Sequence, residues 1–440
     1  MQEMHQLEQQ LDSFDRATRD AALRTLQERA RRGEISLPPV GTDVNVHCHS
    51  FHSYNAYGYS PSKLAWLGRT SGWAVAGIVD FDTLDGLEEF LTAGKLLGLK
   101  ACAGIETRVY VPECATWVMN SPGEPGISYH MGVGIPCPVK ADERVLLTRL
   151  RTISTQRNRE LVARVNTHLD PVTLDYDHDV IPLTPSGNVT ERYICLAYAR
   201  KAHTMMSDSA LSGFWCSRLH VAPEQLDLPE GVKLQALIRA RTMKQGGAGY
   251  VQSDRGSFPK LEEMNDFVTR IGGLPTHTWL DGTSEGEQHI EDVLAIEMRT
   301  GVVALNIIPD RNYGAAGGDE KLANLYHVVE VAEKLDLILV VGTEMNSPGQ
   351  KLVDDFQSPE LALLAPVFLA SAYAIYAHSI LQRGSGLGYA SAWAQQHFPS
   401  RAARKKFYSE LGRVIQIPQE ELLTNLPASV TPRKVLDRIT

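Results

Sequence analysis

The sequence has few cysteines and no apolar stretch that is long enough to cross a membrane. Its six cysteines, among 440 residues, are scattered and form no Cys-x-x-Cys pair, so free thiols in a reducing cytosol are expected. The first residues carry no apolar run, which argues against a signal peptide. Residues 361–377 are nearly uncharged, but this stretch is short and contains Pro366. We therefore expect a buried helix there and a cytoplasmic protein without a membrane anchor.

Several common active-site motifs are also missing. The sequence has no G-x-S-x-G motif, no P-loop and no Rossmann glycine pattern, which argues against serine hydrolases, kinases and dinucleotide-dependent enzymes. A formal net charge of −9 argues against broad nucleic-acid binding, although it leaves room for a local basic pocket. The composition, 43% hydrophobic and 22% charged, is that of a globular protein with material for a large core.

The stretch Val44-Asn45-Val46-His47-Cys48-His49-Ser50 organises the chain. Its alternation of apolar and polar residues predicts a short buried strand. Residues two apart in a strand point the same way, so His47 and His49 project together. Neutral imidazole is a common ligand of divalent metals. On local sequence alone, a pair of histidines on the surface or within a hydrogen-bonded core is an equally good interpretation.

Short apolar runs then alternate with helical patterns, which is typical of βαβ units in a parallel sheet or barrel. Further strands are expected at 74–79, 100–105, 271–277, 302–308 and 337–342. The alternation of strands and helices stops in the middle of the chain, where helical patterns predict an insertion. The expected parts are a helical extension (1–42), a barrel in two parts (43–140 and 269–350), the insertion (141–268) and a C-terminal helical region on the barrel (351–440).

Six candidate metal ligands follow or end the expected strands. They are His47, His49, Glu106, His130, His277 and Glu344. The carboxyl edge of parallel strands is where active sites form in α/β folds. Each residue alone could be a core histidine or a salt-bridged carboxylate, but their shared location favours a metal site.

These residues carry a family resemblance. The motifs are His47-Cys48-His49-Ser50, the segment 80–86, Gly104-Ile105-Glu106, His130, the segment 272–277 and the segment 342–346. As a set, they resemble the motifs of the polymerase-and-histidinol-phosphatase (PHP) family over about 43–136 and 270–350. The resemblance implies a distorted (β/α)7 TIM-like barrel with up to three metal ions. Insertions of the kind expected here also occur in the family's nucleotide phosphoesterase branch.

The resemblance also implies which residues bind each metal. The ligands of the first metal would be His47, His49, Glu106 and Glu344. Those of the second would be Glu106, His130 and His277, with Glu106 bridging the two ions. Glu344 stands where the family usually has Asp, which keeps the charge and should shift the metal slightly.

The ligands of the family's third metal are replaced. The corresponding positions hold Tyr54 or Asn55, then Phe81, then Asn346. Phenylalanine has no lone pair to donate, and amides are poor ligands for zinc-like ions. We therefore expect two metals and an empty third position, which puts ordinary phosphomonoester chemistry in doubt.

Several other polar residues are weaker candidates. Arg108 lies two residues after Glu106 and could clamp an anionic group, or it could simply pair with a carboxylate. His168 could line the cleft from the insertion, and His52 could partly replace a missing ligand despite its spacing. The acidic run 175–179 lacks the glycine and glutamate of a calcium loop, so a solvated loop is the better interpretation.

The favoured function is a metal-dependent hydrolase that acts on a small anionic substrate. Two cations about 3.5–4 Å apart would lower the pKa of a bridging water and polarise the scissile bond, and Glu106, His277 and Arg108 are the candidate catalytic residues. Histidine and carboxylate ligands fit zinc, manganese or iron better than magnesium. A phosphoester is the substrate that the resemblance implies. The alternatives are a non-phosphate ester, lactone or amide, and a metal-binding protein without turnover.

Overall fold

The computed structural model describes residues 2–252, 255–313 and 317–439. The chain forms two compact units. The barrel unit comprises Met1–Ser50, Asn55–Arg144 and Phe258–Thr440, and the helical unit comprises Phe51–Tyr54 and Val145–Ser257. The expected insertion extended to residue 268, but helix α9 (Leu261–Arg270) lies in the barrel unit, where it packs against β3 and β5.

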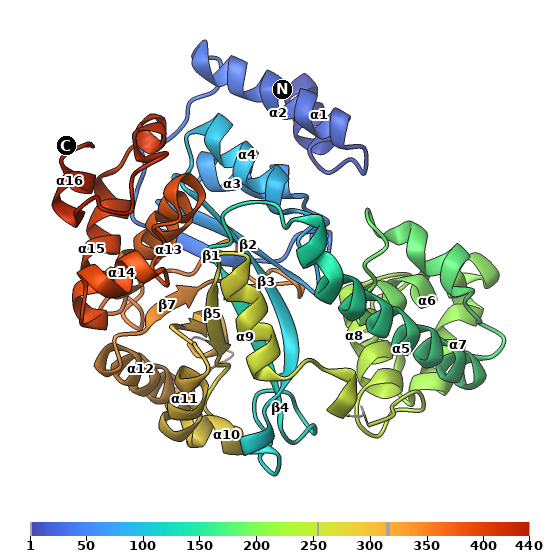
Figure 1. Cartoon of the computed structure of the whole chain (residues 1–440). Helices are drawn as coiled ribbons and strands as arrows, with labels where there is room; N and C mark the ends of the chain where they lie inside the picture. The colour runs from blue at the N-terminus through green and yellow to red at the C-terminus, as the bar shows by residue number, and fades with distance from the viewer. Residues whose placement is uncertain (1, 253–254, 314–316, 440) are drawn as a thin grey trace. The chain divides into compact units, whose positions relative to one another are not determined.

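Seven strands form one sheet in chain order. They are β1 (Val44–Cys48), β2 (Val75–Phe81), β3 (Ala101–Tyr110), β4 (Ile127–Val133), β5 (Leu274–Thr278), β6 (Ala304–Ile307) and β7 (Ile338–Val341). A bridge joins Cys48 of β1 to Glu344, which follows β7, so the sheet is nearly closed into a barrel (Figure 1). This confirms the expected α/β class and TIM-like barrel.

One strand departs from the expected parallel arrangement. β4 runs antiparallel to both β3 and β5, whereas the other neighbouring pairs are parallel. No α-helix separates β3 from β4, and antiparallel neighbours need no helical crossover. His130 therefore lies in the middle of an antiparallel strand, and not at the carboxyl end of a parallel one.

The helices of the barrel unit surround its sheet (Figure 1). They are α1 (Gln2–Gln10), α2 (Arg16–Arg31), α3 (Pro61–Thr70), α4 (Leu87–Leu97), α9, α10 (Glu285–Gln288), α11 (Ile290–Arg299), α12 (Asp319–Lys334), α13 (Ala365–Ser385), α14 (Ala392–His397), α15 (Arg401–Val414) and α16 (Pro432–Leu436). Of these, α1 and α2 lie outside α3 and α4 (Figure 1). The strands β6 and β7 are fully buried, as expected of parallel strands covered by helices. Their apolar residues join those of α12 and α13 in one hydrophobic core.

The terminal helices are part of this unit. α2 contacts α3 and α4, and Arg19 on α2 makes a buried ion pair with Glu89 on α4, with 2.8 Å between Nε and Oε1. Burial raises the pKa of Glu89, but the hydrogen bonds from Arg19 and Ser62 outweigh it and lower that pKa. α13, which contains much of the uncharged stretch, packs on β7 and on β1 to β3. Within the described ranges, no helix is long and apolar enough to cross a membrane.

The helical unit contains α5 (Val145–Leu169), α6 (Glu191–Met205), α7 (Asp208–Leu219) and α8 (Val232–Ile238). The short segment Phe51–Tyr54 belongs to it. Tyr193 donates a hydrogen bond to the carbonyl of Phe51, and the side chain of Asn188 donates to the carbonyl of His52 at 3.0 Å. These contacts explain why four residues that follow the His-x-His strand are part of the helical unit.

Candidate metal centre

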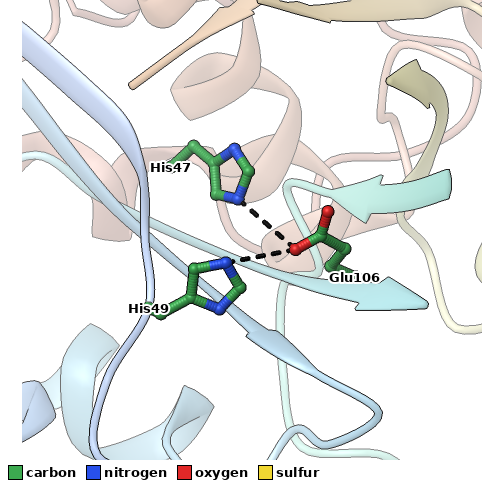
Figure 2. Close-up of side chains that lie close together, drawn as sticks. All are labelled: His47, His49 and Glu106. Carbon is green, nitrogen blue, oxygen red and sulfur yellow. Dashed lines mark ion pairs between the residues drawn. The ribbon is translucent and has the colours of Figure 1, made fainter. Parts of the chain in front are cut away.

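Three buried side chains of the barrel unit come together at the end of β1 and the middle of β3. His47 lies on β1, His49 directly follows it, and Glu106 lies on β3 (Figure 2). Nε2 of His49 is 3.1 Å from Oε2 of Glu106, and Nε2 of His47 is 3.8 Å from the same oxygen. We call these three residues the metal trio, because their ligand atoms all lie within 4.8 Å of one another.

The spacing of the trio suits a transition-metal ion. Two ligand atoms that are each about 2.1 Å from a tetrahedral metal lie about 3.4 Å apart. The distances of 3.1 and 3.8 Å to Oε2 of Glu106 bracket this value, and the ligand atoms of the two histidines lie within 4.8 Å of each other. Three protein ligands also leave one position of a tetrahedral metal open, as in catalytic rather than structural sites.

A hydrogen bond from β6 orients one of the histidines. Nδ1 of His47 lies 2.9 Å from Oδ1 of Asn306, which can only accept, so Nδ1 carries the proton. Nε2 of His47 is then the lone-pair nitrogen, and it faces Glu106 without a hydrogen bond to any described residue. Such a partner fixes the tautomer that a metal requires. We did not predict the role of Asn306, because pairing between distant strands determines it.

Burial and mutual contacts shift the pKa values of Glu106 and His49 in the metal trio. Burial raises the pKa of Glu106, but contacts with His47 and His49 outweigh this and lower it to about 2. Burial lowers the pKa of His49, and the hydrogen bond and charge of Glu106 reverse that effect and raise it. The carboxylate is therefore ionised at neutral pH, which is the form that binds a cation.

Glu344 joins β7 to β1 through its backbone. Its N–H donates to the carbonyl of His47 at 2.9 Å, and its carbonyl accepts from the N–H of His49 at 2.7 Å. Glu344 and Met345 have φ angles of 61° and 57°, in the left-handed region that side chains other than glycine rarely occupy. Such backbone strain is concentrated at functional sites.

The carboxylate of Glu344 makes an ion pair with a residue that we did not predict. Nη2 of Arg311 donates to Oε2 of Glu344 at 2.8 Å, and Nε2 of Gln350 donates to the same oxygen at 3.2 Å. Burial raises the pKa of Glu344, but the charges of Arg311 and His47 lower it overall. The structure thus places Glu344 beside the metal trio and in contact with Arg311.

His130 and His277 lie on the other face of the sheet. His130 is opposite Thr107 on β3 and opposite His277 on β5, whereas Glu106 is opposite Met131. Cross-strand partners share a face and successive residues alternate, so the two histidines face away from Glu106. Gly132 shares their face, and a Cβ built on it would lie 2.5 Å from Val268 of α9. Their side chains therefore point toward the outer helices.

A separate buried cluster surrounds these two histidines. Nδ1 of His277 lies 2.9 Å from Oε2 of Glu297 on α11. Burial lowers the pKa of His277, and the charge of Glu297 reverses this and raises it. Burial lowers the pKa of His130 to about 4, so His130 is neutral at pH 7. The structure does not bring this pair together with Glu106.

The residues at the positions that the resemblance assigns to a third metal each make other contacts. Phe81 is opposite Glu106 and packs edge-on against Tyr129, with ring centroids 6.1 Å apart. Asn55 donates to the carbonyl of His49 at 2.8 Å and thereby shapes the turn. Tyr54 donates to Gln235 at 3.3 Å within the helical unit, and Oδ1 of Asn346 lies 3.3 Å from the hydroxyl of Ser347.

The weaker candidates have structural partners. Nη1 of Arg108 donates to Glu124 at 2.7 Å. Nε2 of His168 lies 3.0 Å from the carbonyl oxygen of Arg218, and Nδ1 of His52 lies 3.1 Å from the hydroxyl of Ser186. In the acidic run, the side chain of Asp175 caps the following turn by accepting hydrogen bonds from the backbone N–H groups of residues 177 and 178.

Two solved structures are similar to this chain. An amidohydrolase from Chromobacterium violaceum, solved with bound sulfate and no metal, matches with a TM-score of 0.50 and 16% identity, over 72% of this chain and 93% of that one. A proposed metal-dependent phosphoesterase from Bifidobacterium adolescentis matches with a TM-score of 0.48 and 15% identity, over 74% and 97%. No family model and no curated protein sequence matches. At these identities the likeness is one of fold.

Proposed function

We propose that the protein is a metal-dependent hydrolase, with the metal trio as its metal-binding centre and a phosphoester as its substrate. The observation that carries this proposal is the convergence of His47, His49 and Glu106, buried and with ligand atoms within 4.8 Å. The PHP resemblance assigns these same residues to the first metal. The structural neighbours, described as an amidohydrolase and as a proposed phosphoesterase, are in keeping with such a hydrolase.

The three residues of the trio and Asn306 would have distinct roles in binding the metal. His47 and His49 would supply neutral nitrogen ligands, and Asn306 would hold His47 in the correct tautomer. Glu106 would supply the negative charge that favours a cation in a buried site. A bound divalent cation would act as a Lewis acid toward the scissile group and would lower the pKa of a water molecule.

The number of ions is a separate part of the proposal. A dinuclear centre bridged by Glu106 would need His130 and His277, whose side chains lie on the opposite face of the sheet. The trio by itself would hold one ion. Metal analysis of the purified protein distinguishes the two arrangements, because one equivalent per chain favours the trio alone and two favour the dinuclear centre.

A second candidate is hydrolysis of a carboxylic ester, lactone or amide. Phe81 and Asn346 stand where the family holds a third ion, which favours a substrate other than a phosphomonoester. The test is a hydrolysis screen of metal-reconstituted protein with phosphomonoesters, phosphodiesters, lactones and amides. Turnover that requires metal and is lost in His49→Gln supports the proposed function. Metal-free protein with full turnover, or loaded protein with none across the screen, contradicts it.

A further inference from the structure

Arg311 is a cationic side chain beside the metal trio. It ends the short 3₁₀ helix Pro309–Arg311, which follows β6. The pKa of Arg311 is raised mainly by the charge of Glu344, and Tyr129 and Glu106 add to this effect against burial. Tyr129 is opposite Arg108, which lies on the same face of β3 as Glu106. Glu106 and Tyr129 thus lie on the barrel's inner face.

The guanidinium of Arg311 donates to Glu344 and has further N–H groups that could donate to a ligand. Glu344 accepts from Nη2 at 2.8 Å and is held in turn by Gln350. A guanidinium has five N–H donors, and the Nε donor of Arg311 has no acceptor among the described residues. That nitrogen is itself covered, but 42% of the side chain is exposed, so an anionic oxygen from solvent would bind at the exposed part of the side chain.

Arg311 opposes the negative charge around the trio. Glu106 and Glu344 are carboxylates that act on Arg311, and Asp80 is a third carboxylate that acts on His49. A divalent cation bound at the trio would add two positive charges to that of Arg311, and both cations would attract an anion.

Arg108, the arginine that the sequence favoured, is engaged elsewhere. Its Nη1 pairs with Glu124 at 2.7 Å, and its guanidinium lies 4.7 Å from the ring centre of Phe258. Both contacts anchor it to neighbouring structure. Arg311, in contrast, is anchored to Glu344, a residue that hydrogen-bonds through its backbone to the His47–His49 segment.

We propose that Arg311 binds the phosphoryl oxygens of the substrate, and that Glu344 and Gln350 are positioning residues that fix its guanidinium. The planar fork of arginine matches tetrahedral oxyanions, and hydrogen bonds between charged groups are the strong ones. This inference rests on the proposed function, because the substrate class comes from it. It adds a specificity-determining residue that the sequence motifs do not contain.

The test measures sulfate binding by titration calorimetry, on metal-free and on manganese-loaded full-length protein. Arg311→Met should weaken sulfate binding by about 10- to 100-fold, as expected for loss of hydrogen bonds between charged groups. Arg311→Lys should weaken it less, because the charge remains and the fork is lost. The matched control is Arg433→Met, which removes one positive charge from a side chain that is 91% exposed, and it should leave the affinity unchanged.

Two further measurements keep the outcomes distinct. Metal analysis of each variant shows whether the trio is loaded, and Arg108→Met tests the competing arginine. Unchanged sulfate affinity in Arg311→Met, or a larger loss in Arg108→Met, would overturn the assignment of Arg311. If the protein binds no metal and hydrolyses nothing, but Arg311→Met still loses sulfate, then the proposed function fails while the anion site stands.

Discussion

Replacing Glu106 by glutamine should remove most of the stabilisation of the protein by metal. The change keeps the shape of a side chain that is 4% exposed, and removes the charge shared by ligand atoms 3.1 and 3.8 Å away. Loss of an outer partner of a metal ligand typically weakens binding 10- to 100-fold, so loss of the ligand charge should weaken it by about 100-fold or more. At a metal concentration of 100 times the wild-type Kd, the stabilisation should fall from about 2.7 kcal/mol to about 0.4 kcal/mol.

The assay is denaturant unfolding of wild type and E106Q, with and without manganese or zinc at that concentration. Glu291→Gln is the matched control, since its carboxylate lies on the outer helix α11 with 60% of the side chain exposed. E291Q should show the full stabilisation by metal. If E106Q retained the wild-type difference between loaded and metal-free protein, Glu106 would not be a ligand.

Three further predictions concern other side chains. Burial, with the charge of Asp310 as a second cause, raises the pKa of Asp354 from 3.8 to about 8. The folded state therefore keeps a proton that the unfolded state releases, and stability should fall by about 1.4 kcal/mol per pH unit between those values. Asp354→Asn should flatten this dependence in unfolding titrations, and an unchanged slope would refute it. Phe81→His combined with Asn346→His should add a bound cation in metal analysis, because two imidazoles replace groups that ligate poorly. His277→Gln should leave the trio loaded, and loss of all metal would show that the two faces of the sheet share one centre.

Local patterns predicted the barrel and the pair His47 and His49, whereas Glu106 was assigned to the same site only by the family resemblance. Alternation over Val44–Cys48 and the continuous apolar run of β7 reflect burial on one or both faces of a sheet. The period of two also places His47 and His49 on one face. These inferences need no knowledge of which strands pair.

The direction of β4 and the partner of Glu344 could not be predicted in the same way. The segment around His130 alternates equally well in a parallel or an antiparallel strand, yet its register determines the face on which the imidazole lies. Arg311 follows a strand in a Pro-Asp-Arg turn that carries no motif. Its role depends on contact with a residue 33 positions later in the chain. The contact of Asn306 with His47 could not be predicted for the same reason, since the two residues are 259 positions apart.

The join between β1 and β7 has a consequence for the order in which the protein folds. The trio comes from β1 and β3, which pair with β2 as parallel neighbours within the first 110 residues. The backbone hydrogen bonds of Glu344 that close the barrel require a segment made much later during synthesis. Contacts of such sequence separation form slowly, because loop closure is entropically unfavourable. The ligands can therefore meet on the nascent chain before the barrel encloses them, and a cation captured at that stage would favour the pairing of β1 to β3.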